Sequence, residues 1–203
     1  MRSGAGKPGR RIPAKCKSVY EKRAFSTRGE SLLVPRIHVC PLSKVPETVR
    51  ATGARSLVTL VDNGTPVRRP LGIAAEDHLV MALSDIAVAV EGHTLPNESH
   101  VEELLAFVRR WDQAAPLLIH CWAGVSRSTA AAFIAACDLR PHRDEAEFAQ
   151  EVRIKSPTAT PNPRLVAVAD AVLGRNGRMI GAIVQIGRGA DCSEGAPFAL
   201  ELR

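Results

Sequence analysis

The stretch "LLIHCWAGVSRSTAAAFIAACDL" (residues 117–139) decides the fold. It begins with an apolar run over 116–120, which is typical of a central strand in a covered sheet. A short turn with Gly124 follows, and the small, apolar residues of 127–137 predict a buried helix. The order strand, turn, helix is a building unit of α/β domains. We therefore expect Cys121 at the carboxyl end of a strand and Arg127 at the start of a helix.

Further strands and helices alternate before this unit, and helices follow it. Ser99 with Glu102 forms a predicted capping box at the start of one of these helices. Strands are predicted at 36–40, 56–61, 78–83 and 116–120, and helices within 46–53, from Ser99, at 127–137, from Asp144, from Asn162 and at 179–186. This order predicts an α/β fold with a central, mostly parallel sheet flanked by helices and a helical C-terminal half.

Charge is distributed unevenly along the 203 residues. The net charge is +6, but residues 1–36 hold ten Lys or Arg against two Glu, so the remainder is close to neutral. We expect a basic, disordered tail at 1–35, a folded domain at 36–190 and a C-terminal tail at 191–203. The basic tail has hardly any aromatic side chains to stack on bases, so nucleic acid is not an expected partner.

The cysteines and the hydropathy indicate the cellular compartment in which the protein is expected. Five cysteines without any C-x-x-C spacing do not indicate a disulfide framework. Near the stretch 117–139, the longest uncharged apolar run is far shorter than the ~18 residues of a membrane span. We expect a protein of the reducing cytoplasm.

The predicted turn has the properties of an anion-binding loop. A helix amino terminus presents unpaired N–H groups, and Gly124 allows the backbone to curl its amides inward. Arg127 adds a planar fork of donors that matches two oxygens of a phosphate. These groups favour the thiolate of Cys121, which then acts as a nucleophile toward a bound phosphate. The predicted phosphate-binding residues are Trp122, Ala123, Gly124, Val125, Ser126 and Arg127.

The motif His120-Cys121-x5-Arg127-Ser128 resembles the H-C-x5-R-[ST] motif of the cysteine-dependent protein tyrosine phosphatase superfamily. The chain resembles a small, dual-specificity-like, bacterial-type member over roughly residues 36–175. The resemblance implies a protein tyrosine phosphatase-like fold. It also implies that Ser128 bonds the cysteine sulfur and helps it leave, and that His120 orients the loop. A purely structural role for His120, as a strand-end histidine, is an open alternative.

The resemblance further implies a general acid on a loop that follows a strand. Asp85 follows the predicted strand 78–83 and precedes Cys121 by 36 residues, so it is the expected acid. Asp62 is the competitor, but "VDNGTP" is typical of a turn in which Asp caps its own backbone. Asp77 precedes a strand and is expected at the opposite edge of the sheet. The segment 152–162 is similar to one before the family's last helix, and an ordinary helix start at Asn162 is the simpler interpretation.

The residues and the resemblance together predict a phosphomonoesterase that forms a cysteinyl-phosphate intermediate on protein phosphotyrosine, with phosphoserine and phosphothreonine as further candidates. The expected partner is a phosphorylated protein or a small phosphoester, and neither a metal nor a cofactor is implied. Two alternatives stay open. One is a phosphatase of a nucleotide, an RNA 5′-phosphate or a phosphoinositide, although the loop has no lysine. The other is a phosphate-binding module without turnover.

Overall fold

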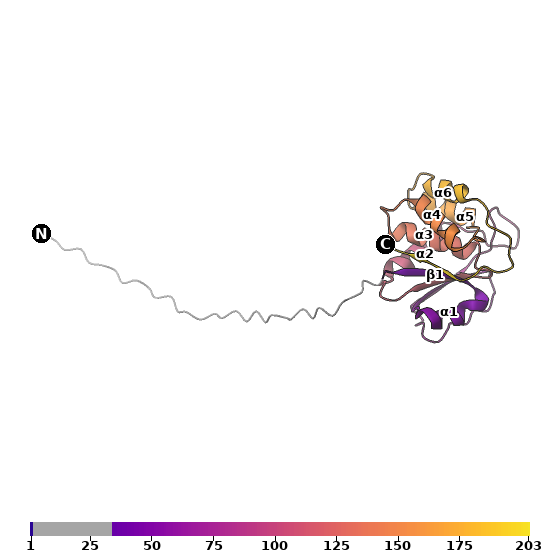
Figure 1. Ribbon diagram of the computed structural model, residues 1–203, viewed down its shortest axis with the longest axis horizontal. Helices are drawn as coiled ribbons and strands as arrows, with labels where there is room; N and C mark the ends of the chain where they lie inside the picture. Colours follow the sequence, from indigo (N-terminus) through magenta and orange to yellow (C-terminus); the bar gives the residue numbers. More distant parts are fainter. Residues whose placement is uncertain (2–33) are drawn as a thin grey trace. The chain divides into compact units, whose positions relative to one another are not determined.

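Five strands form a single sheet in the order β3-β2-β4-β1-β5 (Figure 1). Their bounds are β1 Arg36–Pro41, β2 Ser56–Val61, β3 His78–Ala82, β4 Leu117–Cys121 and β5 Phe198–Glu201. The strands β1 to β4 are parallel, and β5 runs antiparallel beside β1. Every residue of β2 and β4 is buried, in keeping with their apolar sequences. Since the four parallel strands share one direction, their carboxyl ends meet at one edge of the sheet.

The computed structural model describes Met1 and residues 34–203. The chain divides into two units, Met1–Leu32 and Leu33–Arg203, and all the helices and strands named here belong to the second. The predicted basic tail at 1–35 therefore lies almost entirely outside the described residues. Within the described part of the chain, no helix combines the length and the apolar character that crossing a membrane requires.

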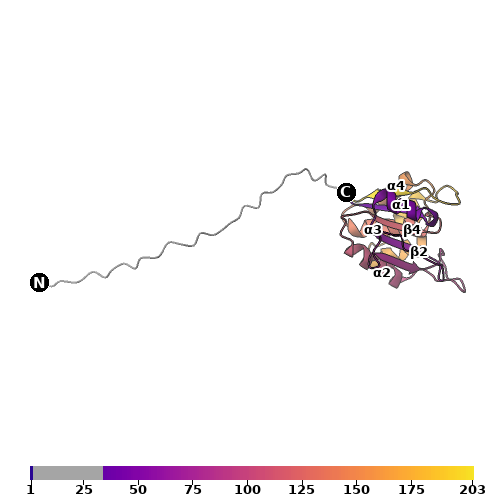
Figure 2. The same cartoon turned by 90° about the horizontal axis from the view of Figure 1, so that it is seen from below.

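Helices cover both faces of the sheet (Figures 1 and 2). One face carries α1 (Val45–Thr52), which follows the short 3-10 helix η1 (Leu42–Lys44). The other face carries α2 (Glu98–Arg110), α3 (Arg127–Leu139), α4 (Glu145–Lys155), α5 (Pro163–Val172) and α6 (Arg178–Ile186). This mixed α/β architecture, with a mostly parallel sheet and a helical C-terminal half, confirms the fold class predicted from the sequence.

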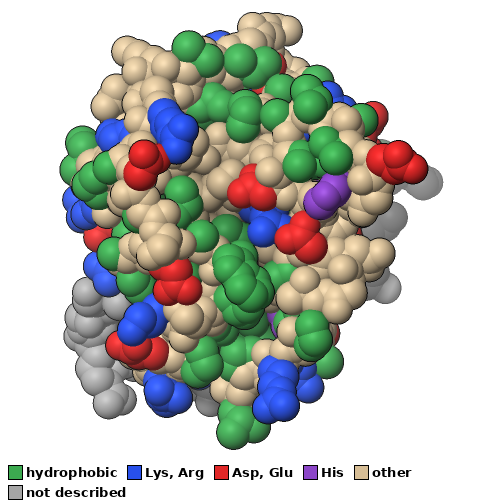
Figure 3. All heavy atoms as spheres, turned by 90° about the vertical axis from the view of Figure 1, so that its right-hand side faces the viewer, with side chains coloured by type: hydrophobic (Ala, Val, Ile, Leu, Met, Phe, Trp, Pro, Cys, Tyr) green, Lys and Arg blue, Asp and Glu red, His purple; other side chains and the backbone are tan. Residues whose placement is uncertain are grey.

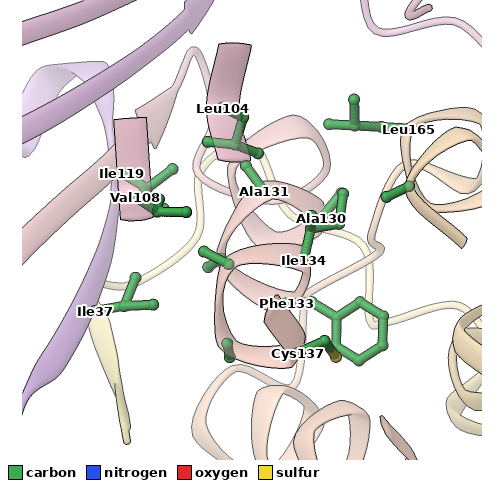
Figure 4. Packing of buried hydrophobic residues seen from close by; sticks show 14 of the residues in the cluster. Ile37, Leu104, Val108, Ile119, Ala130, Ala131, Phe133, Ile134, Cys137 and Leu165 are labelled. Carbon is green, nitrogen blue, oxygen red and sulfur yellow. The ribbon is translucent and has the colours of Figure 1, made fainter. Parts of the chain in front are cut away.

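The helix α3 lies in the middle of the larger core. All of its residues from Arg127 to Cys137 are buried, and five of them are alanines. Small side chains on every side allow strands and helices to approach α3 closely, because large ones would hold them apart. Figure 4 shows Ala130, Ala131 and Phe133 of this helix among residues of α2, α5 and the sheet. The core therefore fixes the helix that begins at Arg127.

Two local predictions are wrong. The helix α2 is capped by Asn97 and not by Ser99, because the Asn97 side chain accepts from His100 N and the His100 ring accepts from Asn97 N. Asn is among the best capping residues, so the capping box forms two residues earlier. In the segment predicted as a C-terminal tail, residues 198–201 form β5. The reason is their alternating apolar pattern, which buries Phe198 and Leu200.

Candidate active site

The carboxyl end of β4 meets the amino end of α3 at a five-residue loop, Trp122 to Ser126. Cys121 is the last residue of β4 and Arg127 is the first of α3, as the sequence predicts. Ligands in open α/β sheets bind at this edge, where the strands end and the helix amino termini point. We call residues 121–127 the Cys121 loop.

The carbonyl groups of the Cys121 loop point outward and are bonded to three other segments of the chain. The donors come from η1, from the segment before β5 and from the connection before α5. The bonds are Leu42 N to Trp122 O (3.1 Å), Gly195 N to Ala123 O (2.8 Å), Thr160 N to Val125 O (2.9 Å) and Asn162 N to Ser126 O (3.3 Å). In a trans peptide the carbonyl and the next amide point in opposite directions. The outward carbonyls therefore turn the following amides toward the interior of the loop.

Cys121 lies inside this ring of amides. Gly124 N donates to Cys121 Sγ at 3.3 Å, and Ser128 Oγ lies 3.1 Å from the same sulfur. The cysteine is 2% exposed and stands over the amino end of a 13-residue helix. Amide dipoles, a hydroxyl group and a helix terminus all stabilise negative charge on sulfur.

Gly124 allows the loop to approach β1. Its φ is +70°, and a Cβ built there would lie 2.6 Å from Pro41 N and 2.8 Å from the carbonyl carbon of Cys40. Any other residue would be strained by the left-handed backbone and would also collide with the strand. Glycine is therefore required for the curled form that brings its amide to Cys121.

The guanidinium of Arg127 is held along one edge only. Its Nη1 donates to Asp62 Oδ2 at 3.1 Å and to Leu83 O at 2.9 Å. The Nε is buried and has no hydrogen-bond partner among the described residues. An unpaired buried donor is unusual and calls for an explanation, and an oxyanion bound in the loop would satisfy it.

Asp62 contacts Arg127 in the site, although the sequence around it favours a turn residue. Burial raises the pKa of its carboxyl group, but the Ser84 hydrogen bond and the charge of Arg127 outweigh burial and lower that pKa. The carboxylate is thus ionised beside the guanidinium. The signal was its position, because Asp62 directly follows β2 and so lies at the edge where Cys121 lies.

Asp85, the predicted acid, lies next to the Cys121 loop. Its Oδ1 accepts from Ser126 Oγ at 2.6 Å and from Asn162 Nδ2 at 2.8 Å. Asn162 is 2% exposed, and its Oδ1 accepts from Leu165 N at 2.9 Å as the cap of α5. The Asn162 side chain therefore begins α5 and also orients Asp85. The sequence predicts the helix start but not the contact with Asp85.

His120 is buried on the α1 face of the sheet. Burial lowers the pKa of its ring to about 4, so the ring is neutral at pH 7. Its Nδ1 lies 3.4 Å from Cys121 O and its Nε2 lies 2.7 Å from Thr59 Oγ1. Because a carbonyl only accepts, Nδ1 carries the proton and Nε2 accepts from the Thr59 hydroxyl. His78 Nε2, 2.8 Å from the same oxygen, then donates to it, and this chain of bonds fixes the tautomer of His120.

The rim of the site is formed by exposed side chains. Trp122, within the loop, is 61% exposed. Figure 3 shows a face of the molecule on which acidic and basic side chains gather in a hollow, with histidine and hydrophobic side chains around them. Among residues 34–203, no three His, Cys, Asp or Glu side chains form a group suited to hold a metal ion.

No protein-family model matches the chain, and no curated protein matches it in sequence. Solved structures do match. The PTP-2 phosphatase of Cydia pomonella has a TM-score of 0.53 and 24% identity, over 66% of this chain and 84% of that one. DUSP15 has a TM-score of 0.55 and 15% identity, over 75% and 91%, and human DUSP28 has 0.52 and 20%, over 68% and 94%. At these identities the likeness concerns the backbone, and the chain has the α/β fold that these three structures share.

Proposed function

We propose that the protein is a cysteine-dependent phosphomonoesterase that acts on protein phosphotyrosine. The observation that carries this proposal is the Cys121 loop itself. A buried sulfur lies within hydrogen-bond distance of an amide and a hydroxyl, below amides that four outward carbonyls turn inward. The unpaired Nε of Arg127 faces no protein acceptor among the described residues and suits an oxygen of a phosphoryl group. The shared fold with phosphatase structures supports the same reaction class.

In the first step, the Cys121 thiolate attacks phosphorus in line with the leaving oxygen. A sulfur–phosphorus bond forms while the phosphorus–oxygen bond of the ester breaks. Asp85, which Ser126 and Asn162 hold beside the loop, gives its proton to the leaving oxygen. The amides of the loop and Arg127 stabilise the charge on the equatorial oxygens throughout.

In the second step, water attacks the cysteinyl phosphate and gives its proton to Asp85. The sulfur–phosphorus bond breaks, and Ser128 Oγ, 3.1 Å from Sγ, stabilises the departing thiolate. The result is inorganic phosphate and the free enzyme. Phosphoserine and phosphothreonine peptides react by the same steps where their shorter side chains reach the sulfur.

The test uses an aryl phosphate in the presence of reductant, because a nucleophilic thiolate oxidises readily. Cys121→Ser abolishes turnover and leaves the fold intact, while the control Cys192→Ser, at an exposed cysteine, turns over normally. Asp85→Asn lowers turnover by about 10²–10⁴-fold, most strongly for poor leaving groups. Activity of Cys121→Ser near that of the wild type refutes the mechanism. A panel of phosphopeptides, phosphoinositides and nucleotides then identifies the substrate class.

A further inference from the structure

The segment between α6 and β5, residues 187–197, passes along the outside of the Cys121 loop. We call it the C-terminal strap. At one end, Ala190 N donates to Pro157 O at 3.0 Å and Gly189 N donates to Thr160 Oγ1 at 3.1 Å. Near the other end, Ser43 Oγ donates to Glu194 Oε2 at 2.9 Å. The strap thus joins the connection before α5 to η1, two segments that also bond to carbonyls of the loop.

Gly195 is the point at which the strap touches the loop. Its N–H donates to Ala123 O at 2.8 Å, the shortest of the four backbone bonds to the outward carbonyls. Gly195 is buried, and a Cβ built on it would lie 3.1 Å from Gly124 O and 3.4 Å from Val125 Cγ2. The peptide that Gly195 holds is the one between Ala123 and Gly124. Its opposite end is the amide that donates to Cys121 Sγ at 3.3 Å.

We propose that Gly195 is a positioning residue of the active site, which holds the Ala123 carbonyl outward and thereby directs the Gly124 amide at the sulfur and at a bound phosphate. The inference rests on the proposed function, because it assigns the strap to the same reaction. Without the Gly195 donor, the Ala123–Gly124 peptide loses its restraint. An amide that turns away from the loop no longer stabilises the thiolate or the phosphoryl oxygens.

The experiment compares three variants. Gly195→Pro removes the N–H, and Gly195→Ala keeps it. Ser193→Pro places the same ring at an exposed strap position whose N–H has no hydrogen bond among the described residues. We expect Gly195→Pro to lower kcat for an aryl phosphate by roughly 10–10²-fold, less than the about 10²–10³-fold for outright loss of one oxyanion donor, because the Gly124 amide is freed and not removed. It also weakens competitive inhibition by inorganic phosphate. Gly195→Ala keeps the donor but crowds Gly124 O with its Cβ, so it lowers kcat less than Gly195→Pro does. Ser193→Pro retains kcat within about threefold, since it leaves the Gly195 donor in place.

A second measurement uses the wild-type protein and does not depend on the folding of any variant. In a protein labelled with ¹⁵N-glycine, the Gly195 amide exchanges slowly with solvent, and inorganic phosphate shifts the Gly124 amide resonance. If the wild type turns over the substrate, either of two results overturns the role of the strap. One is fast exchange of the Gly195 amide, and the other is a normal kcat in Gly195→Pro. Equal losses in Gly195→Pro and Gly195→Ala also overturn it, because they point to bulk and not to the donor. Absence of turnover in the wild type contradicts the proposed function instead, and the exchange of Gly195 still reports on the bond.

Discussion

Replacing Gly124 by alanine tests the close approach of the Cys121 loop to β1. The new Cβ meets two backbone atoms, Pro41 N at 2.6 Å and the Cys40 carbonyl carbon at 2.8 Å, and neither can move as a side chain would. The left-handed backbone costs about 1–2 kcal/mol for a residue with a Cβ. Displacing packed backbone costs about 1–3 kcal/mol more. We therefore expect the free energy of unfolding to fall by about 2–5 kcal/mol.

Gly53→Ala is the matched control. Gly53 has a φ of +69°, almost that of Gly124, but a Cβ built there has nothing within 4 Å. Its cost is the backbone cost alone, about 1–2 kcal/mol. Urea unfolding of both variants separates the two contributions, and aryl phosphate turnover reports on the loop. We expect turnover to fall by roughly 10²-fold in Gly124→Ala, since a shift of about 1 Å in a reacting group has that effect, and to stay normal in Gly53→Ala. Equal stability of the two variants with normal turnover in both refutes the close approach.

Two further predictions concern Asn162 and His120. Asn162→Ser keeps a capping oxygen for α5 but removes the amide that donates to Asp85, so turnover of esters with poor leaving groups falls roughly 10-fold while stability changes by about 1 kcal/mol or less. An unchanged rate would separate Asn162 from the chemistry. Burial lowers the folded-state pKa of His120 from 6.5 to about 4, so the unfolded chain binds the proton first. The free energy of unfolding then falls by about 3 kcal/mol as the pH drops from 6.5 to 4, and His120→Gln lacks this part of the slope in urea unfolding at each pH. Identical pH dependence of the free energy of unfolding in the wild type and in His120→Gln contradicts the lowered pKa of His120.

The central part of the fold follows from local sequence pattern. The apolar runs of β2 and β4 are continuous because both strands are covered on both faces, and Gly53 ends α1 in the left-handed conformation that glycine commonly adopts there. The predicted start of α2 was wrong because Asn97 and Ser99 are both good capping residues, and only the folded backbone selects between them. The strand β5 was missed because four residues of alternating pattern are too few to stand out without the neighbouring β1.

The candidate site is predicted where its residues share one motif or follow a predicted strand. Cys121, Arg127 and Ser128 come from one motif, and the resemblance pointed to Asp85 because it follows a predicted strand and precedes Cys121 by 36 residues. Contacts between distant segments are a different matter. Gly195 and Asn162 donate hydrogen bonds to residues far away in sequence, and Asp62 reaches Arg127 across 65 positions. Such pairs depend on how the edges of the sheet and the loops come together, which local pattern does not encode.

The burial of α3 on all sides has a consequence for how the protein unfolds and loses activity. A helix at the rim of a domain can detach and return, whereas one enclosed by strands and helices is freed only when those layers part. Heat inactivation and loss of the fold are therefore expected to be a single event. The amides of Ala131 to Ala135 would then exchange with deuterium no faster than the whole domain unfolds.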